Sequence, residues 1–227
     1  MKDHFEPGLM TFLRELAANN QREWFEEHRP QYEQLLREPA FAFINAMADE
    51  LLHLSPFYEA SARKNGGSLM RINRDVRFGH DKRPYKTNVG IQFRHQSGRD
   101  VHAPGFYLHI EPGEVFVGVG VWHPAAPQLA QIRDAIVEKP EAYQAAIQHP
   151  DFLAHFSLVG DSLIRPPRGY DPAHPLINEL KRKDFIALCA LSEDELWQPG
   201  LAKRVAEYFA AGSSLQAWLC QVLGLRY

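Results

Sequence analysis

The chain has 227 residues, of which 45% are hydrophobic, 23% charged and 11% aromatic, and its formal net charge is -3. This content suffices for one large domain or two small ones, and a mean hydropathy of -0.36 without an apolar run of about 18 residues excludes a membrane-spanning helix. An isoelectric point near 6.4 argues against a broad nucleic-acid-binding face, which is normally strongly basic.

The first third of the chain predicts three amphipathic helices. Glu23 follows Asn20 by three residues, which is the pattern of a capping box at the start of the second helix. Pro39 fits the first turn of the third helix, and Pro56 follows its end. Apolar residues recur at intervals of three and four over residues 5–16, 24–36 and 43–54.

The middle of the chain predicts an antiparallel sheet. Alternating and β-branched stretches follow one another there, as is typical of strands with one buried face. The sequence Glu-Pro-Gly-Glu at 111–114 predicts a tight hairpin turn between two of them. The expected strands cover residues 69–78, 89–94, 106–110, 115–122 and 185–191.

The rest of the chain predicts further helices around a proline-rich loop. Pro140 divides the helical region 124–147, Ser192 and Glu195 form a second capping-box pattern, and Gly212 separates the last two helices. We therefore expect an α+β fold, with a central mostly antiparallel sheet and with N-terminal and C-terminal helices packed on it. Residues 1–227 are expected to form a single domain.

The expected compartment is the cytoplasm. The first seven residues lack the apolar core of a signal peptide. Cys189 and Cys220 both lie in apolar stretches, where a free thiol behaves as a small core residue. Two unpaired buried cysteines are typical of a reducing environment.

Residues 71–87 concentrate basic charge in an otherwise acidic chain, with six basic and two acidic side chains. If residues 69–78 form a strand, Arg74 lies alone among the apolar residues of one face. An unpaired buried charge costs on the order of 3 to 5 kcal/mol, so Arg74 needs a carboxylate, solvent or a ligand anion. An internal salt bridge and a ligand contact both remain open.

The opposite face of this expected strand carries Arg71, Asn73, Asp75 and Arg77. Such an array of N–H donors can bind a carboxylate or a phosphate through paired hydrogen bonds, and Asp75 would orient the cations or act as an acid or base. The alternative is an ordinary solvated sheet face.

Residues 80–87 contain a proline and are expected to form a loop, where binding sites are often built. His80 or Asp81 is a candidate acid or base, Lys82 and Lys86 are candidate phosphate ligands, and Tyr85 is a candidate stacking or catalytic hydrogen-bonding group. Alternatively, Asp81 only fixes the turn and Tyr85 only packs.

A second basic cluster combines Arg165 and Arg168 of the proline-rich loop with residues 181–183 at a helix end. If it converges with residues 71–87, the two form a positive cleft that attracts small anions to a negative molecule. Basic residues at the C-terminal end of a helix are also ordinary partners of the helix dipole.

The metal and cofactor signals are weaker. His109 and Glu111 share one face of an expected strand and His123 ends the next, but no HExxH or paired CxxC motif accompanies them. The dinucleotide fingerprint, the P-loop and the nucleophile elbow are also absent. We predict no metal site, and the cofactor stays unknown.

At these residues the chain resembles the proteins grouped as domain of unknown function 2461. The resemblance implies one domain but no established activity, cofactor or catalytic residue. Gly79 stands where many relatives carry a serine, which puts a hydroxyl contact in that turn in doubt. The motifs that carry the resemblance span nearly the whole chain: Asn19 to Phe25, Arg71 to Phe78, Asp81 to Thr87, Gly105 to Leu108, Gly120 to Pro124 and Arg165 to Tyr170 with Leu180 and Lys181.

Three functional hypotheses follow. The first is a basic cleft that binds a small ligand bearing a phosphate or carboxylate, with or without catalysis, through the basic residues of both clusters. The second is a nucleic-acid or RNA-associated module in which aromatic residues such as Phe78, Tyr85, Phe106 or Tyr107 stack on bases. The third is a non-enzymatic scaffold whose arginines are internal struts. The sequence does not indicate an oligomeric state.

Overall fold

A six-stranded antiparallel sheet forms the centre of the computed structural model, which describes residues 3–77, 81–97 and 103–227. The strand order is β1-β2-β3-β4-β6-β5, and every neighbouring pair is antiparallel. The strands are β1 (Tyr58–Glu59), β2 (Val89–His95), β3 (Gly105–Glu111), β4 (Glu114–Val121), β5 (Ser157–Val159) and β6 (Phe185–Ala190).

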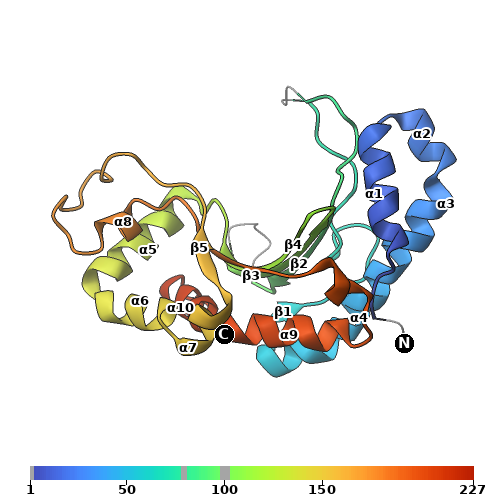
Figure 1. Cartoon of the computed structure of the whole chain (residues 1–227). Helices are drawn as coiled ribbons and strands as arrows, with labels where there is room; N and C mark the ends of the chain where they lie inside the picture. The colour runs from blue at the N-terminus through green and yellow to red at the C-terminus, as the bar shows by residue number, and fades with distance from the viewer. Residues whose placement is uncertain (1–2, 78–80, 98–102) are drawn as a thin grey trace.

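Three long helices cover one face of this sheet. They are α4 (Glu38–Leu54), α9 (Leu201–Ala211) and α10 (Ser213–Val222), which lie below the strands in Figure 1. The strands bury alternate residues against them: in β3, Phe106, Leu108 and Ile110 are fully buried, while the residues between them are half-buried on the opposite face. These three helices therefore do not cover the opposite face of the sheet.

Two groups of helices stand at the ends of the sheet and make the molecule concave above this second face (Figure 1). One group leads into α4 through a turn of π-helix, η1; the other surrounds β5, and a 3-10 helix, η2, precedes α9. The first group is α1 (Gly8–Ala18), α2 (Arg22–Glu27), α3 (Arg29–Tyr32) and η1 (Glu33–Arg37); the second is α5 (Ala126–Glu138), α6 (Pro140–Ile147), α7 (Pro150–His155) and α8 (Ile177–Leu180), and η2 is Glu193–Trp197.

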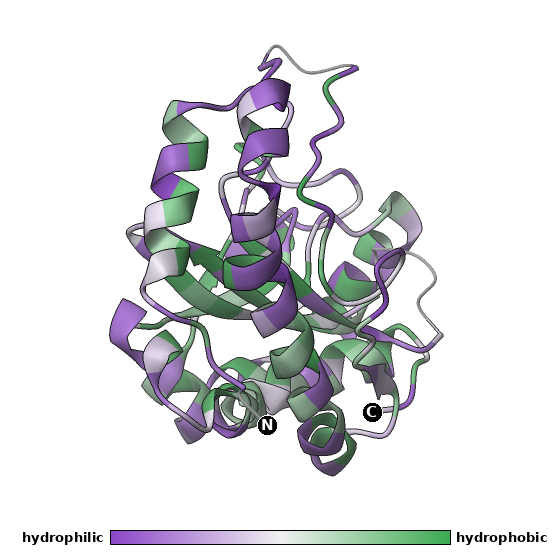
Figure 2. Cartoon of the chain, turned by 90° about the vertical axis from the view of Figure 1, so that its right-hand side faces the viewer, coloured by the Kyte–Doolittle hydropathy of each residue, from purple (hydrophilic) through white to green (hydrophobic). Residues whose placement is uncertain are grey.

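One continuous hydrophobic cluster joins the sheet to helices from both ends of the chain. Within it the ring of Phe93 in β2 lies 6.3 Å from that of Phe43 in α4 and 6.1 Å from that of Phe209 in α9. In Figure 2 the strands are mostly hydrophobic, whereas the helices have both hydrophobic and hydrophilic surfaces.

The single-domain organisation stays a prediction. In the described part of the chain, none of the helices has the length and apolar character needed to span a bilayer.

The α+β fold and most of its elements are confirmed. Four of the five expected strands occur within one residue of their expected ends as β2, β3, β4 and β6. The turn at 111–114 pairs Glu111 with Glu114, and Gly113 adopts a φ of 84° that favours glycine. The capping box of Ser192 and Glu195 is present at the start of η2.

The expected strand at 69–78 is wrong for the described residues 69–77, which form only isolated bridges from Leu69 to Ile91 and from Asn73 to Tyr85. We call residues 68–77 and 81–87 the arm. Its two segments are joined by scattered backbone hydrogen bonds, such as that from Lys86 N–H to the Ile72 carbonyl (2.7 Å), and Pro84 offers no donor to complete a ladder. Burial still alternates over residues 71–77.

The expected capping role of Asn20 is also wrong. Gln21 occupies the N-cap of α2, and no side chain caps this helix. The Asn20 side chain instead makes two hydrogen bonds of 3.0 Å to the backbone of Tyr85: its amide N–H donates to the carbonyl oxygen, and its oxygen accepts from the N–H. Asn20 therefore fixes the arm to the N-terminal helices.

We predict that Asn20→Ala lowers the free energy of unfolding by about 1 to 3 kcal/mol, because both backbone groups of Tyr85 lose their partner. Denaturant unfolding measures this change, and hydrogen exchange should show loss of protection at the Tyr85 amide. The control is Asn19→Ala, which removes one exposed hydrogen bond to the Glu15 carbonyl. Equal destabilisation by the two substitutions would contradict the role of Asn20.

Candidate functional site

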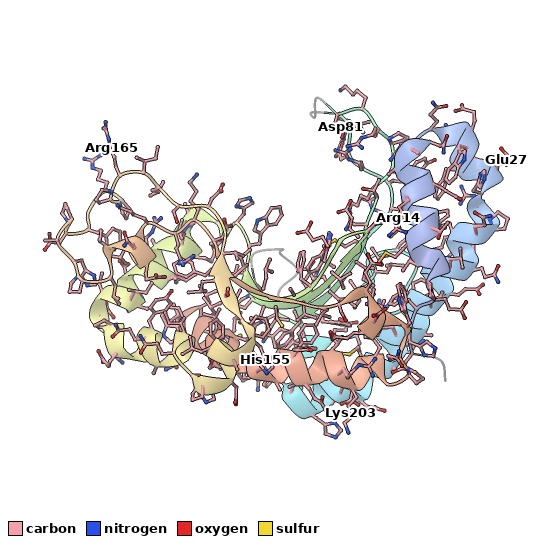
Figure 3. All side chains as sticks on the ribbon, in the orientation of Figure 1. Arg14, Glu27, Asp81, His155, Arg165 and Lys203 are labelled. Atoms are coloured by element: carbon pink, nitrogen blue, oxygen red, sulfur yellow. The ribbon has the colours of Figure 1, made fainter. Side chains whose placement is uncertain are left out.

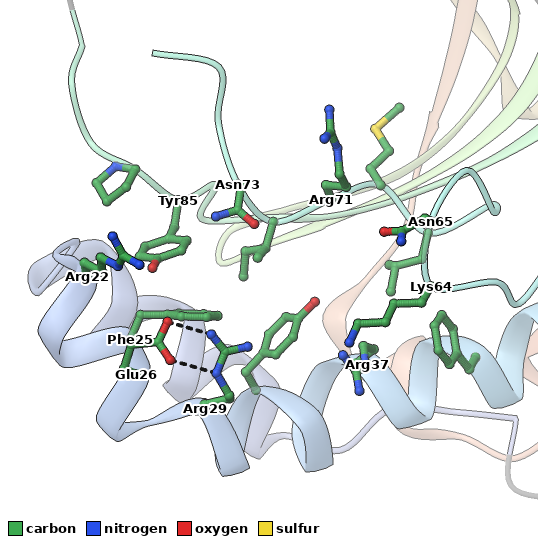
Figure 4. Close-up of a pocket in the computed structure, with 16 residues that line it drawn as sticks. Arg22, Phe25, Glu26, Arg29, Arg37, Lys64, Asn65, Arg71, Asn73 and Tyr85 are labelled. Atoms are coloured by element: carbon green, nitrogen blue, oxygen red, sulfur yellow. Dashed lines mark hydrogen bonds and ion pairs between the residues drawn. The ribbon is translucent and has the colours of Figure 1, made fainter. Parts of the chain in front are cut away.

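A pocket of about 410 Å³ lies between the arm and the helices α2 to α4 (Figure 4). Five basic side chains and one carboxylate line it, together with aromatic and apolar residues. Its charged residues are Arg22, Glu26, Arg29, Arg37, Lys64 and Arg71. The pocket thus concentrates positive charge in a chain whose net charge is -3.

A tight loop at 61–68 presents Lys64 and Asn65 to this pocket. Ser61 and Ser68 close the loop: the N–H of Ser68 donates to the Ser61 carbonyl (2.8 Å), and the N–H of Ser61 donates to the Ser68 hydroxyl (3.0 Å). Gly67 is required there, because a Cβ atom would collide with the carbonyl oxygen of Ser61. Backbone geometry therefore sets the position of Lys64.

Helices supply three of the other cations of the pocket, and the arm supplies Arg71. Arg29 donates two hydrogen bonds to Glu26, at 2.9 and 2.6 Å, and these raise the pKa of Arg29 while lowering that of Glu26. Arg37 pairs with Glu33 within the π-helical turn η1. Turns of π-helix are rare overall, and those that occur are often found at functional sites. Both guanidiniums are fixed by a neighbouring carboxylate.

Three of the five cations lack such a carboxylate. Arg22, Lys64 and Arg71 form no ion pair with any residue that the structure describes. In Figure 4, Lys64 points toward Arg37 and Arg22 lies beside Tyr85, whereas the guanidinium of Arg71 points away from α2 and α3. Two like charges that converge at one end of a pocket favour a bound anion.

Aromatic rings form the wall between these charges. The ring of Tyr85 stacks on Phe25 with centroids 4.1 Å apart, and Phe25 lies 5.3 Å from Tyr32. Burial raises the pKa of both tyrosines, so their hydroxyl groups stay protonated near neutral pH. Of the candidate catalytic residues that the structure describes, only Tyr85 lines the pocket, and this residue is 5% exposed.

The arginine predicted to lie alone, Arg74, pairs with Asp81. Asp81 also accepts hydrogen bonds from Arg83, at 3.0 and 2.7 Å. These contacts, from Arg83 first and then from Arg74, hold the pKa of Asp81 well below its usual range. A carboxylate of this kind holds guanidiniums in place and is a poor proton shuttle at neutral pH.

Asp75, Arg77 and Lys82 also form hydrogen bonds within the arm. Arg77 donates hydrogen bonds to Asp75, at 2.9 and 2.6 Å, and the pKa of Asp75 is lowered by them. Lys82 donates to the Val76 carbonyl at 2.9 Å. Lys86 is half-buried, and its pKa is lowered by burial and then by the charge of Arg71. Phe78, Gly79 and His80 lie outside the described residues.

The expected convergence of the two basic clusters is wrong. Arg165 and Asp81 stand at opposite ends of the molecule in Figure 3. Arg165 and Arg168 are both exposed in the proline-rich loop, and Arg182 pairs with Glu179. The fold separates these clusters because one follows α4 and the other precedes β6, at opposite ends of the concave face.

The aromatic residues expected to stack on bases are mostly covered. Phe106 is fully buried on the helix-covered face of the sheet, and Tyr85 of the arm is buried with its ring stacked on Phe25. Tyr107 is half-buried on the uncovered face. The three of these positions that the structure describes do not form a row of exposed rings of the kind typical of single-stranded nucleic-acid binding.

Sequence reasoning missed four of the pocket's cations: Arg22, Arg29, Arg37 and Lys64. The three arginines are separated by seven or eight positions along α2, α3 and η1, a spacing close to two helical turns that would have placed them on one side. The turn signal Asn-Gly-Gly at 65–67 could have marked the loop that carries Lys64.

We predict that Asp81 titrates below its ordinary pKa of about 3.9. Because its folded pKa is lowered, ionised Asp81 stabilises the folded arm above that value, and this contribution is lost as the pH falls toward the folded pKa. An NMR titration of the carboxyl carbon measures the midpoint. Arg83→Gln should raise it and Arg63→Gln should leave it unchanged; an unchanged midpoint in Arg83→Gln would count against the contact.

Comparison with known proteins identifies one family. No curated protein and no solved structure matches the chain. The family described as conserved hypothetical protein (DUF2461) matches residues 8–218, from the start of α1 into α10. The match includes the arm and every residue that lines the pocket. The chain therefore belongs to the DUF2461 family of conserved hypothetical proteins.

Proposed function

We propose that the protein binds a small ligand bearing a phosphate or carboxylate group in the pocket beneath the arm. The observation that carries this proposal is the pair of cations Arg22 and Lys64, which line the pocket without an ion-pair partner among the described residues. An anion beside either cation would neutralise a positive charge that no described carboxylate pairs with directly.

The anionic group binds at the end of the pocket where Lys64 points toward Arg37. Lys64 acts as a flexible point charge, whereas Arg37 is held by Glu33 and offers N–H donors of fixed direction. The loop at 61–68 positions Lys64 from the opposite side to the helices. An anion at this end is thus contacted from two separate elements.

The rest of the ligand extends along the aromatic wall toward Arg22. The edges of Phe25, Tyr32 and Tyr85 offer apolar contact, and Asn65 and Asn73 offer polar contacts at the rim. A volume of about 410 Å³ lies within the range of about 300 to 1,000 Å³ that is typical of small-molecule sites. This favours a ligand of metabolite size over a polymer.

The arm arginines have a different part in this proposal. Arg74 and Arg77 are paired with carboxylates and act as struts, as the scaffold hypothesis expected of them. Arg71 and Lys86 interact electrostatically with each other and contribute positive potential near the pocket. Arg165 stands at the opposite end of the molecule from Asp81 of the arm in Figure 3, and neither Arg165 nor Arg168 lines the pocket.

We predict that Lys64→Gln weakens anion binding by about ten-fold or more, since a hydrogen bond to a charged group contributes about 1.5 to 3 kcal/mol, and that Arg22→Gln weakens binding only of probes long enough to reach the opposite end of the pocket. The probes are inorganic phosphate, a nucleoside monophosphate, a sugar phosphate and succinate. Calorimetry and thermal shift on the full chain should show one site for at least one of them.

The matched control is Arg63→Gln, which changes an exposed cation of the same loop that pairs with Glu59 and does not line the pocket. It should bind like the wild type. Absence of binding by every probe, or equal effects of Lys64→Gln and Arg63→Gln, would refute the proposal. Tight binding of single-stranded RNA with a log-log salt slope of about 0.7 per phosphate would favour the nucleic-acid hypothesis instead.

A further inference from the structure

A second cluster of chemically active side chains lies on the uncovered face of the sheet, in the hairpin of β3 and β4. His109 and Glu111 point to this face from β3, and Glu114 begins β4 opposite Glu111. One ligand atom from each residue lies within 4.8 Å of those from the other two. None of the three lines the basic pocket.

The spacing of these atoms fits a metal ion better than a hydrogen bond. Nε2 of His109 lies 3.4 Å from Oε2 of Glu111, whereas an N–H···O hydrogen bond normally spans about 2.7 to 3.2 Å. Two ligands at zinc distances of about 2.0 to 2.2 Å lie about 3.4 Å apart at a tetrahedral centre. Glu114 is exposed and can rotate to complete the set.

Neighbouring groups hold the two β3 ligands in an orientation suited to a metal. The Tyr107 hydroxyl lies 3.1 Å from Nδ1 of His109, so it can accept that N–H and leave Nε2 free as a ligand. Thr87 donates to Oε1 of Glu111 at 2.8 Å.

The ring of His109 is held as well. It stacks on Phe116, its neighbour across the β3–β4 pair, with centroids 4.6 Å apart and planes inclined by 5°. A ligand that is fixed before binding loses less conformational entropy when the ion arrives.

The charges at the hairpin also favour a cation. Glu111 and Glu114 face each other across the strand pair, an arrangement of like charges that destabilises a sheet. No Lys or Arg in the described part of the chain forms a salt bridge with either carboxylate; Arg83, whose pKa is raised by Asp81 first and then by Glu111, pairs with Asp81. A divalent ion between them would remove this repulsion.

We infer that His109, Glu111 and Glu114 form a site for a divalent transition metal of the zinc type. One imidazole and two carboxylates suit zinc, and three protein ligands leave a coordination position for water or a ligand. His123 takes no part, because it follows the far end of β4 and its Nδ1 atom lies 2.9 Å from Asp184. Magnesium binds more weakly, since it prefers oxygen ligands throughout.

Calorimetric titration of the full chain with zinc chloride tests this site. We expect one zinc ion per chain in the wild type and at least about ten-fold weaker binding in His109→Gln and in Glu114→Gln. Glu114 is exposed, so its replacement by glutamine should preserve the fold. The control is Glu138→Gln, an exposed carboxylate at the end of α5, which should bind zinc like the wild type.

Thr87 provides an independent measure of the same site. Thr87→Val removes the hydroxyl that orients Glu111 and should weaken zinc binding by about 10- to 100-fold, whereas Thr87→Ser should restore it. Far-UV circular dichroism checks that the variants fold. Absence of zinc binding by the wild type, or unchanged affinity in both His109→Gln and Glu114→Gln, would overturn the inference.

Discussion

The two hydrogen bonds between the side chain of Asn20 and the backbone of Tyr85 hold the arm against the N-terminal helices. The basic pocket occupies the space between these two elements, so its width depends on this contact. An amide side chain is suited to the position, because it offers a donor and an acceptor to the N–H and C=O of one residue. The arm is thus fixed through its backbone, and Arg71 and Asn73 remain available for other contacts.

The two candidate sites differ in chemistry and lie on different parts of the fold. Cations dominate the pocket, whereas an imidazole and two carboxylates gather on the uncovered face of the sheet. Gly90 of β2 lies between them. A Cβ atom there would come within 2.8 Å of the Tyr107 hydroxyl and 3.0 Å of the Met70 sulfur, so a glycine allows Tyr107 to lie across the strand and reach His109.

The sequence was sufficient for the fold class because strand alternation and helical periodicity are local signals. It also placed Arg71 and Tyr85 in a basic region. It did not predict that Asn20 reaches Tyr85, since the two are 65 positions apart and a side-chain-to-backbone bond leaves no pattern. An internal salt bridge of Arg74 to an unspecified carboxylate was likewise only one of two interpretations, and Lys64 was overlooked. Contacts of this kind depend on tertiary structure, which periodicity does not encode.

The hairpin of β3 and β4 has a consequence for the order in which the molecule assembles. The imidazole and the two carboxylates of the proposed metal site come from residues 109–114, which a two-residue turn brings together. Isolated hairpins close in about 1 to 10 μs, whereas contacts between distant segments must overcome a larger loss of chain entropy. We therefore expect this cluster to form early in folding, and the pocket, which joins residues from 22 to 85, to form late.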